Sequence, residues 1–73
     1  MDELTFTQTV RRLEPRLYRT AMSLLWHDQD AADALQECIL KAWTKRHTLK
    51  VEAYFDTWLT RILINEWNVI CQG

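Results

Sequence analysis

The sequence predicts an all-α fold, a compact three-helix bundle. The 73-residue chain contains one Gly and one Pro, too few for the tight turns that β-sandwiches and barrels need. Apolar residues recur at spacings of three and four along most of the chain, which is the period of amphipathic helices. Four Trp, two Tyr and two Phe enlarge the core of so short a chain, because aromatic side chains bury the most apolar area. We therefore expect one monomeric helical domain over residues 1–73.

The first helical segment carries its apolar residues on one face. This stripe consists of Phe6, Val10, Leu13, Leu17, Ala21, Leu24 and Leu25. Pro15 interrupts the segment. Because proline has no N–H to donate inside a helix, we expect a kink or a short break there, with Pro15 opening the second part. The polar run at residues 27–30 ends the segment, and Asp28 or Asp30 is a natural N-cap for the next helix.

Two further helices are predicted, over residues 30–46 and from about residue 53 to near the end, with a loop over residues 47–52 between them. The buried stripe of the second helix is Ala31, Leu35, Cys38, Ile39 and Ala42, flanked by Trp43. The stripe of the third is Phe55, Trp58, Leu59, Ile62 and Val69. Glu66 falls on this last stripe, where an ideal core helix has an apolar residue.

Charge is sorted along the chain, although the formal net charge is only −1. A first basic stretch holds Arg11, Arg12, Arg16 and Arg19, with Glu14 as the acid among them. Residues 27–40 contain acids but no Lys or Arg, whereas residues 41–50 contain Lys41, Lys45, Arg46 and Lys50 but no acid. Such sorting can present an acidic surface to one partner and a basic surface to another. Solvated helix faces are the alternative interpretation.

Catalytic and metal-binding patterns are missing from the sequence. The single Gly is the last residue, so there is no glycine-rich phosphate loop. His27 and His47, together with Cys38 and Cys71, lack the close ligand pairs of zinc sites, and Cys38 has the position of a buried free thiol. We therefore expect no enzyme and no cofactor. No apolar stretch approaches the about 20 residues that cross a bilayer, and the N-terminal residues lack the hydrophobic run of a signal peptide. We therefore expect a cytoplasmic protein without membrane contact.

Two segments carry specific motifs. The first, DAADALQECILKAW, runs from Asp30 to Trp43 and places two carboxylates and an amide opposite the apolar stripe, an array that suits an Arg-bearing partner. The second, FDTWLTRILIN, runs from Phe55 to Asn65. Both segments resemble region 2 of the sigma factors, most closely the extracytoplasmic-function group. The matching positions of the first motif are Asp30, Ala31, Asp33, Gln36 and Glu37, with Ile39 in place of the usual aromatic residue.

The second motif is similar to the family pattern Phe-x-x-Trp-Leu-x-x-Ile-Ala-x-Asn, and the stretch EPRLYR at residues 14–19 also fits, less specifically. The family usually continues with a polar residue four positions after the asparagine and then a basic one. Here Asn68 comes three positions after Asn65, and no Lys or Arg follows Arg61. We interpret this as a one-residue deletion or an altered end, which would also explain Glu66 on the apolar stripe. Family members continue into a second domain that reads the −35 element, and we expect this chain to lack it.

The resemblance implies a transcription initiation domain with two binding surfaces. In the family, one surface docks on the β′ clamp helices of the RNA polymerase core, and the other captures the non-template strand of the opened −10 element. Matched positions assign Asp33, Gln36 and Glu37 to polymerase binding, and we include Lys41 in that surface. The resemblance also suggests an anti-sigma factor as a further protein partner.

The DNA-binding surface combines the matched residues with a basic, aromatic loop flank, the mixture that single-strand binders use. Its predicted members are Arg46, His47, Lys50, Tyr54, Trp58, Arg61 and Asn65. Trp58 also has the spacing of a core residue, Asn65 could cap or bond locally, and Asp33 could serve only the helix dipole. A protein-interaction bundle that uses the acidic face without touching DNA is the alternative function.

Overall fold

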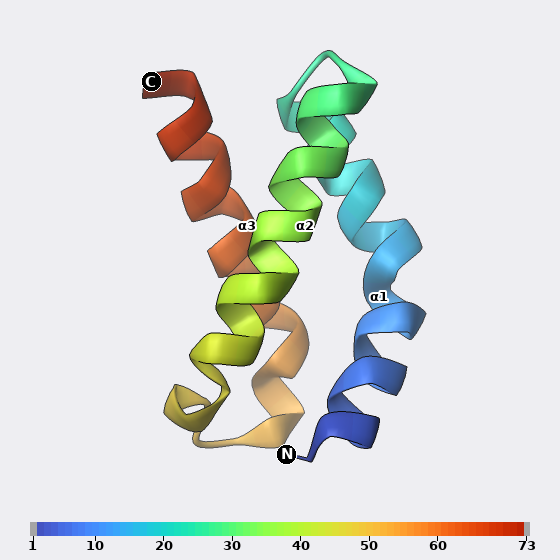
Figure 1. Cartoon of the computed structure of the whole chain (residues 1–73), viewed down its shortest axis with the longest axis vertical. Coiled ribbons are helices and arrows are strands. Elements are labelled where there is room, and N and C mark those ends of the chain that lie inside the picture. Colours follow the sequence, from blue (N-terminus) through green and yellow to red (C-terminus); the bar gives the residue numbers. More distant parts are fainter. Residues whose placement is uncertain (1, 73) are drawn as a thin grey trace.

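The computed structural model describes residues 2–72, and the side chains of residues 2–69. Within this part of the chain three α-helices are joined by short connections and there is no strand, which confirms the predicted all-α bundle. The elements in order are α1 (Glu3–Leu24), α2 (Asp28–Thr44), the 3-10 turns η1 (Arg46–Thr48) and η2 (Glu52–Tyr54), and α3 (Phe55–Gln72). In Figure 1, α2 runs lengthwise between α1 and α3, and the two 3-10 turns lie at the same end of the bundle as the start of α1.

Helix α1 begins at a side-chain cap and continues without interruption. Asp2 accepts a hydrogen bond from the backbone N–H of Thr5 at 2.8 Å, and its hydrogen bonds with Thr5 lower the pKa of Asp2. The helix passes through Pro15, so the predicted break there is wrong; a kink stays a prediction. Pro15 and Arg11, whose carbonyl loses its helical partner, are both exposed, and water can therefore replace the missing hydrogen bond.

Helix α2 begins two residues earlier than predicted, at Asp28. The N-cap is His27, which makes no side-chain cap hydrogen bond, so the N-cap predicted at Asp28 or Asp30 is wrong. Both acids lie in the first turn instead, where a negative charge is favourable beside the helix dipole. Asp28 also accepts a hydrogen bond from the Tyr18 hydroxyl at 3.3 Å, which joins α2 to α1.

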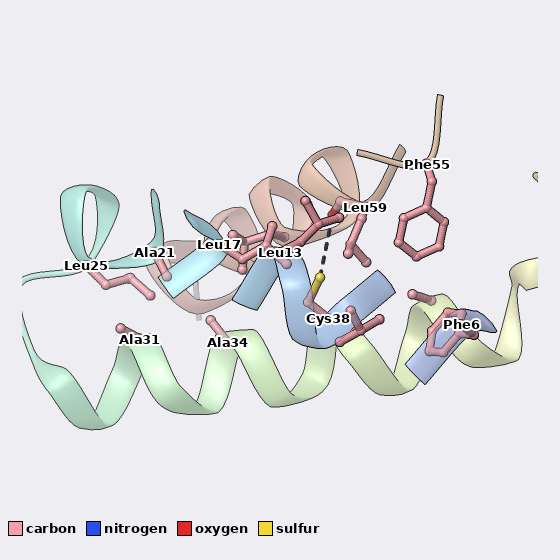
Figure 2. Close-up of a cluster of buried hydrophobic side chains, with 13 residues drawn as sticks. Phe6, Leu13, Leu17, Ala21, Leu25, Ala31, Ala34, Cys38, Phe55 and Leu59 are labelled. Atoms are coloured by element: carbon pink, nitrogen blue, oxygen red, sulfur yellow. Dashed lines mark hydrogen bonds between the residues drawn. The ribbon is translucent and has the colours of Figure 1, made fainter. Parts of the chain in front are cut away.

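The core fills the space between the three helices (Figure 2). Its buried members are Phe6, Val10, Leu13, Leu17, Ala21, Leu25, Ala31, Ala34, Cys38, Ala42, Phe55, Leu59 and Leu63. Helix α2 contributes mainly alanines, which let α1 and α3 approach its backbone closely. The predicted stripes need correction at several positions. Ala34 and Leu63 are core residues that were missed, and Val69 is 60% exposed. The predicted stripe residues that are only half-buried are Leu24, Leu35, Ile39, Trp58 and Ile62.

Aromatic contacts close the loop end of the bundle. The ring of Phe6 lies edge-on to Trp43 at 5.1 Å and to Phe55 at 5.8 Å between centroids. These T-shaped pairs join the start of α1, the end of α2 and the start of α3. At the opposite end, Trp67 Nε1 donates to the Leu24 carbonyl at 3.0 Å. The connection over residues 45–54 runs between Trp43 and Phe55, which both contact Phe6. This aromatic cluster therefore fixes the two ends of the connection, where the candidate site lies.

Candidate functional site

An acidic face lies on the outer side of α2. Asp33, Gln36 and Glu37 are all exposed, and their spacing places them one turn apart on one side of the helix. Gln29 Nε2 donates to Asp33 Oδ1 at 3.1 Å, which fixes one edge of this face. The face can therefore offer carboxylate and amide groups to a cationic or hydrogen-bonding partner in a fixed array.

A groove between α1 and α2 borders the acidic face. It is an open hollow of about 390 Å³. Its lining residues are Glu14, Tyr18, Ala32, Leu35, Gln36, Ile39 and Leu40. Gln36 belongs to both the groove and the face, and Leu40 is 54% exposed. Sequence reasoning missed this groove because its walls come from two segments far apart in the chain, around Glu14 and Tyr18 on α1 and around Leu40 on α2. The position of Leu40 off the predicted apolar stripe was a usable signal.

Lys41 points towards α3 rather than lying free beside Glu37. Its Nζ donates to Glu66 Oε1, and this hydrogen bond raises the pKa of Lys41. Glu66 is the one buried charged residue among the side chains that the structure describes. Its place on the apolar stripe is therefore explained by a cation partner on the neighbouring helix, without a deletion or an altered end. Whether Lys41 also contacts a polymerase stays a prediction.

A second hollow, of about 510 Å³, lies where the 45–54 connection meets α3. Its lining residues are Thr48, Leu49, Lys50, Val51, Tyr54, Thr57, Trp58 and Arg61. Four of the residues predicted to bind DNA thus gather around one concavity: Lys50, Tyr54, Trp58 and Arg61. Tyr54 is 66% exposed, whereas the Trp58 ring is half-buried and lies 5.7 Å from the Phe55 ring. The hollow combines apolar walls, two cations and aromatic rings.

Three predicted members of the set, Arg46, His47 and Asn65, do not line the hollow. The guanidinium carbon of Arg46 lies 3.7 Å from the centroid of the Trp43 ring, and Arg46 Nη1 donates to the Trp43 carbonyl at 2.6 Å. Arg46 thus closes the end of α2, which leaves its charge only partly available. His47 is exposed in η1 but does not line the hollow.

Asn65 is exposed on α3, one turn after Arg61. Its side chain makes no hydrogen bond within the described part of the chain, so the local bonding considered from the sequence is not seen. Asn65 comes seven positions after Trp58, and this spacing places both on the same side of the helix. The amide therefore remains available as both donor and acceptor.

Cys38 is a structural residue. Its Sγ donates to the Leu59 carbonyl at 3.5 Å (Figure 2), and burial raises the pKa of the thiol to about 12. The predicted buried free thiol is confirmed, whereas the side chain of Cys71 lies outside the described residues. In the described part of the chain no group of His, Cys, Asp and Glu could hold a metal ion. The helices found there are too short or too polar to cross a membrane.

Known proteins match nearly the whole of this bundle. The family described as Sigma-70 region 2 matches residues 9–68. Two curated relatives, each named ECF RNA polymerase sigma factor SigM, come from two strains of Mycobacterium tuberculosis. Each of them is 34% identical to this chain over 64 residues. The match covers 88% of this chain, which spans about 33% of the length of each relative. No solved structure gives a significant match. The chain belongs to the sigma-70 region 2 family, as the resemblance in its two motifs predicted.

Proposed function

We propose that this domain acts in transcription initiation, docking on the β′ clamp helices of RNA polymerase and holding the unpaired −10 element of the promoter. The observation that carries the proposal is the separation of two unlike surfaces. The acidic face lies on the outer side of α2, and the basic, aromatic hollow is built from the 45–54 connection and α3. One bundle can therefore hold a basic protein partner and an anionic strand at the same time.

The docking part of the proposal rests on charge and shape. Asp33 and Glu37 bring carboxylates to the outer side of α2, and Gln36 adds an amide at the edge of the groove. Arginines of a partner helix would bond the carboxylates, and apolar side chains of that helix would enter the groove beside Leu40. The groove runs between two antiparallel helices, α1 and α2. A groove of this kind suits a helical partner, because an amphipathic helix can lay its apolar face between the two walls.

The DNA part of the proposal rests on the hollow at the start of α3. Lys50 and Arg61 would contact phosphates, and Tyr54 and Trp58 would stack on unpaired bases. Asn65 would read one base edge from the next turn of α3, since its exposed amide can donate and accept. The hollow is large enough for a group of the size of a base. Its apolar walls favour a flat, poorly hydrated aromatic ring over a strongly hydrated polar group.

The docking surface is tested by reversing one charge. Glu37→Lys should weaken binding to a β′ clamp-helix fragment by about 1–3 kcal/mol, the scale of a lost charged hydrogen bond, while helicity stays unchanged. The control is Glu3→Lys, which makes the same charge change at an exposed position on α1. Because Glu3 lies in the first turn of α1, where a negative charge favours the helix dipole, the helicity of this control is also checked by circular dichroism. Equal binding of the fragment by Glu37→Lys and wild type would remove Glu37 from the docking surface. If both variants lose the same affinity for the fragment, the loss is caused by the change in net charge and not by the position of Glu37.

A further inference from the structure

In the described part of the chain, a half-buried ion pair joins the two helices that carry the proposed surfaces. Lys41 lies on α2, one turn after Glu37, and its ammonium donates to Glu66 on α3. The Glu66 side chain is 7% exposed and that of Lys41 is 45% exposed. The remaining titratable groups that act on the pair are Glu37, which favours the charged lysine, and the buried Cys38 thiol, which stays neutral beside Glu66.

After Leu63, the one buried residue among the described side chains of α3 is Glu66. Leu63 is the last buried apolar residue of this helix in the described part of the chain, and Val69 is exposed. Trp67 is half-buried, but its ring N–H is bonded to the carbonyl of Leu24 on α1. The ion pair is therefore the polar contact that ties the second half of α3 to α2. Such a pair opposes rotation of one helix about its own axis relative to the other, because rotation would leave the buried carboxylate without a partner.

Asn65 directly precedes Glu66. Neighbouring residues on a helix point about 100° apart, so holding Glu66 inward holds Asn65 on the exposed side that also carries Arg61. We propose that the Lys41–Glu66 pair is a positioning element that aims Asn65 at the unpaired strand. Lys41 is then an internal tie between helices and no direct polymerase contact. This inference rests on the proposed function, because it needs Asn65 to read a base.

The test measures base discrimination. Wild type, Glu66→Gln and Lys41→Met are titrated against a −10 oligonucleotide and against versions changed at one position each. Both variants should reduce discrimination at one position by about three- to tenfold, whereas affinity for a scrambled oligonucleotide and for the clamp-helix fragment should not change. Lys41→Arg keeps a donor for Glu66 and should retain discrimination.

A double-mutant cycle separates positioning from simple loss of structure. In an Asn65→Ala background, Glu66→Gln should cause no further loss at that position, because the group that it aims is gone. Val10→Ala is the stability control, since it removes buried methyl groups from α1 and leaves the pair intact; it should keep discrimination. If Glu66→Gln discriminates as well as wild type, or adds its loss fully to that of Asn65→Ala, the positioning role is overturned. If wild type itself shows no discrimination, the proposed function fails, and this inference fails with it.

Discussion

Replacing Trp58 by Ala should separate packing from base stacking at the hollow beside α3. The Trp58 ring is half-buried, packs against Phe55 at 5.7 Å and lines the hollow. Because only part of the ring lies in the core, we expect a loss of unfolding free energy of about 1–3 kcal/mol, below the about 3–5 kcal/mol of a fully buried aromatic residue. Loss of the stacking platform should weaken oligonucleotide binding by about 1–3 kcal/mol, which is about 5- to 150-fold.

The neighbouring residue provides the matched control. Leu59 is completely buried and does not line the hollow. Leu59→Ala should lose about 2–5 kcal/mol of stability, yet its folded fraction should bind the oligonucleotide as wild type does. Urea unfolding followed by circular dichroism gives the stabilities, and fluorescence anisotropy of a labelled −10 strand gives the affinities. If Trp58→Ala is destabilised as much as Leu59→Ala but binds the strand like wild type, Trp58 is a core residue and the stacking assignment is wrong.

Further outcomes follow from the same contacts. Asn65→Ala should relax preference at one base position by about 1–3 kcal/mol, whereas Lys50→Ala should weaken all sequences alike and flatten the salt dependence; equal discrimination by Asn65→Ala and wild type in anisotropy titrations would remove Asn65 from the site. The domain should keep its helical circular dichroism signal in the presence of a chelator and a reductant, and loss of that signal would reveal a missed ligand or bridge. The pKa of Cys38 rises from its ordinary 9.0 to about 12 in the folded protein, so the unfolded chain releases this proton first. The contribution of the protonated Cys38 thiol to the free energy of unfolding is therefore complete below pH 9, and it is lost progressively as pH rises towards 12. Urea unfolding between these pH values should show a smaller loss of stability for Cys38→Ala than for wild type, and equal losses would show that the thiol does not titrate this way.

The sequence predicted helices well because their signal is local. The spacing of Phe6, Val10, Leu13 and Leu17 is enough to define one face of α1, and the structure buries all four. The break expected at Pro15 is not seen, although this proline lies inside α1, because it is on an exposed side of the helix where water can replace the lost hydrogen bond.

Phase and long-range pairing were harder to predict than helicity. Ile62 and Leu63 are both apolar, so the pattern alone could not decide which of them faces the core, and the structure buries Leu63. The partner of Glu66 lies 25 residues away on another helix, and no local period connects the two. An acid on an apolar stripe does call for a cation nearby, and Lys41, next to the buried Ala42, was the available candidate. The motif residues around Trp58 could be chosen from the sequence, but only the fold shows that they surround one hollow.

Under the proposed function, this bundle holds an unpaired promoter strand while it is docked on the polymerase. The decisive measurement is the affinity for the non-template −10 strand at several salt concentrations with the β′ clamp-helix fragment bound. We expect tighter binding of the −10 strand than of a scrambled one. We also expect the affinity to fall with salt at a log–log slope of about −1.4, since Lys50 and Arg61 would each neutralise one phosphate of a single strand. Equal and salt-independent affinities for both strands would refute strand binding and leave a bundle that binds protein alone.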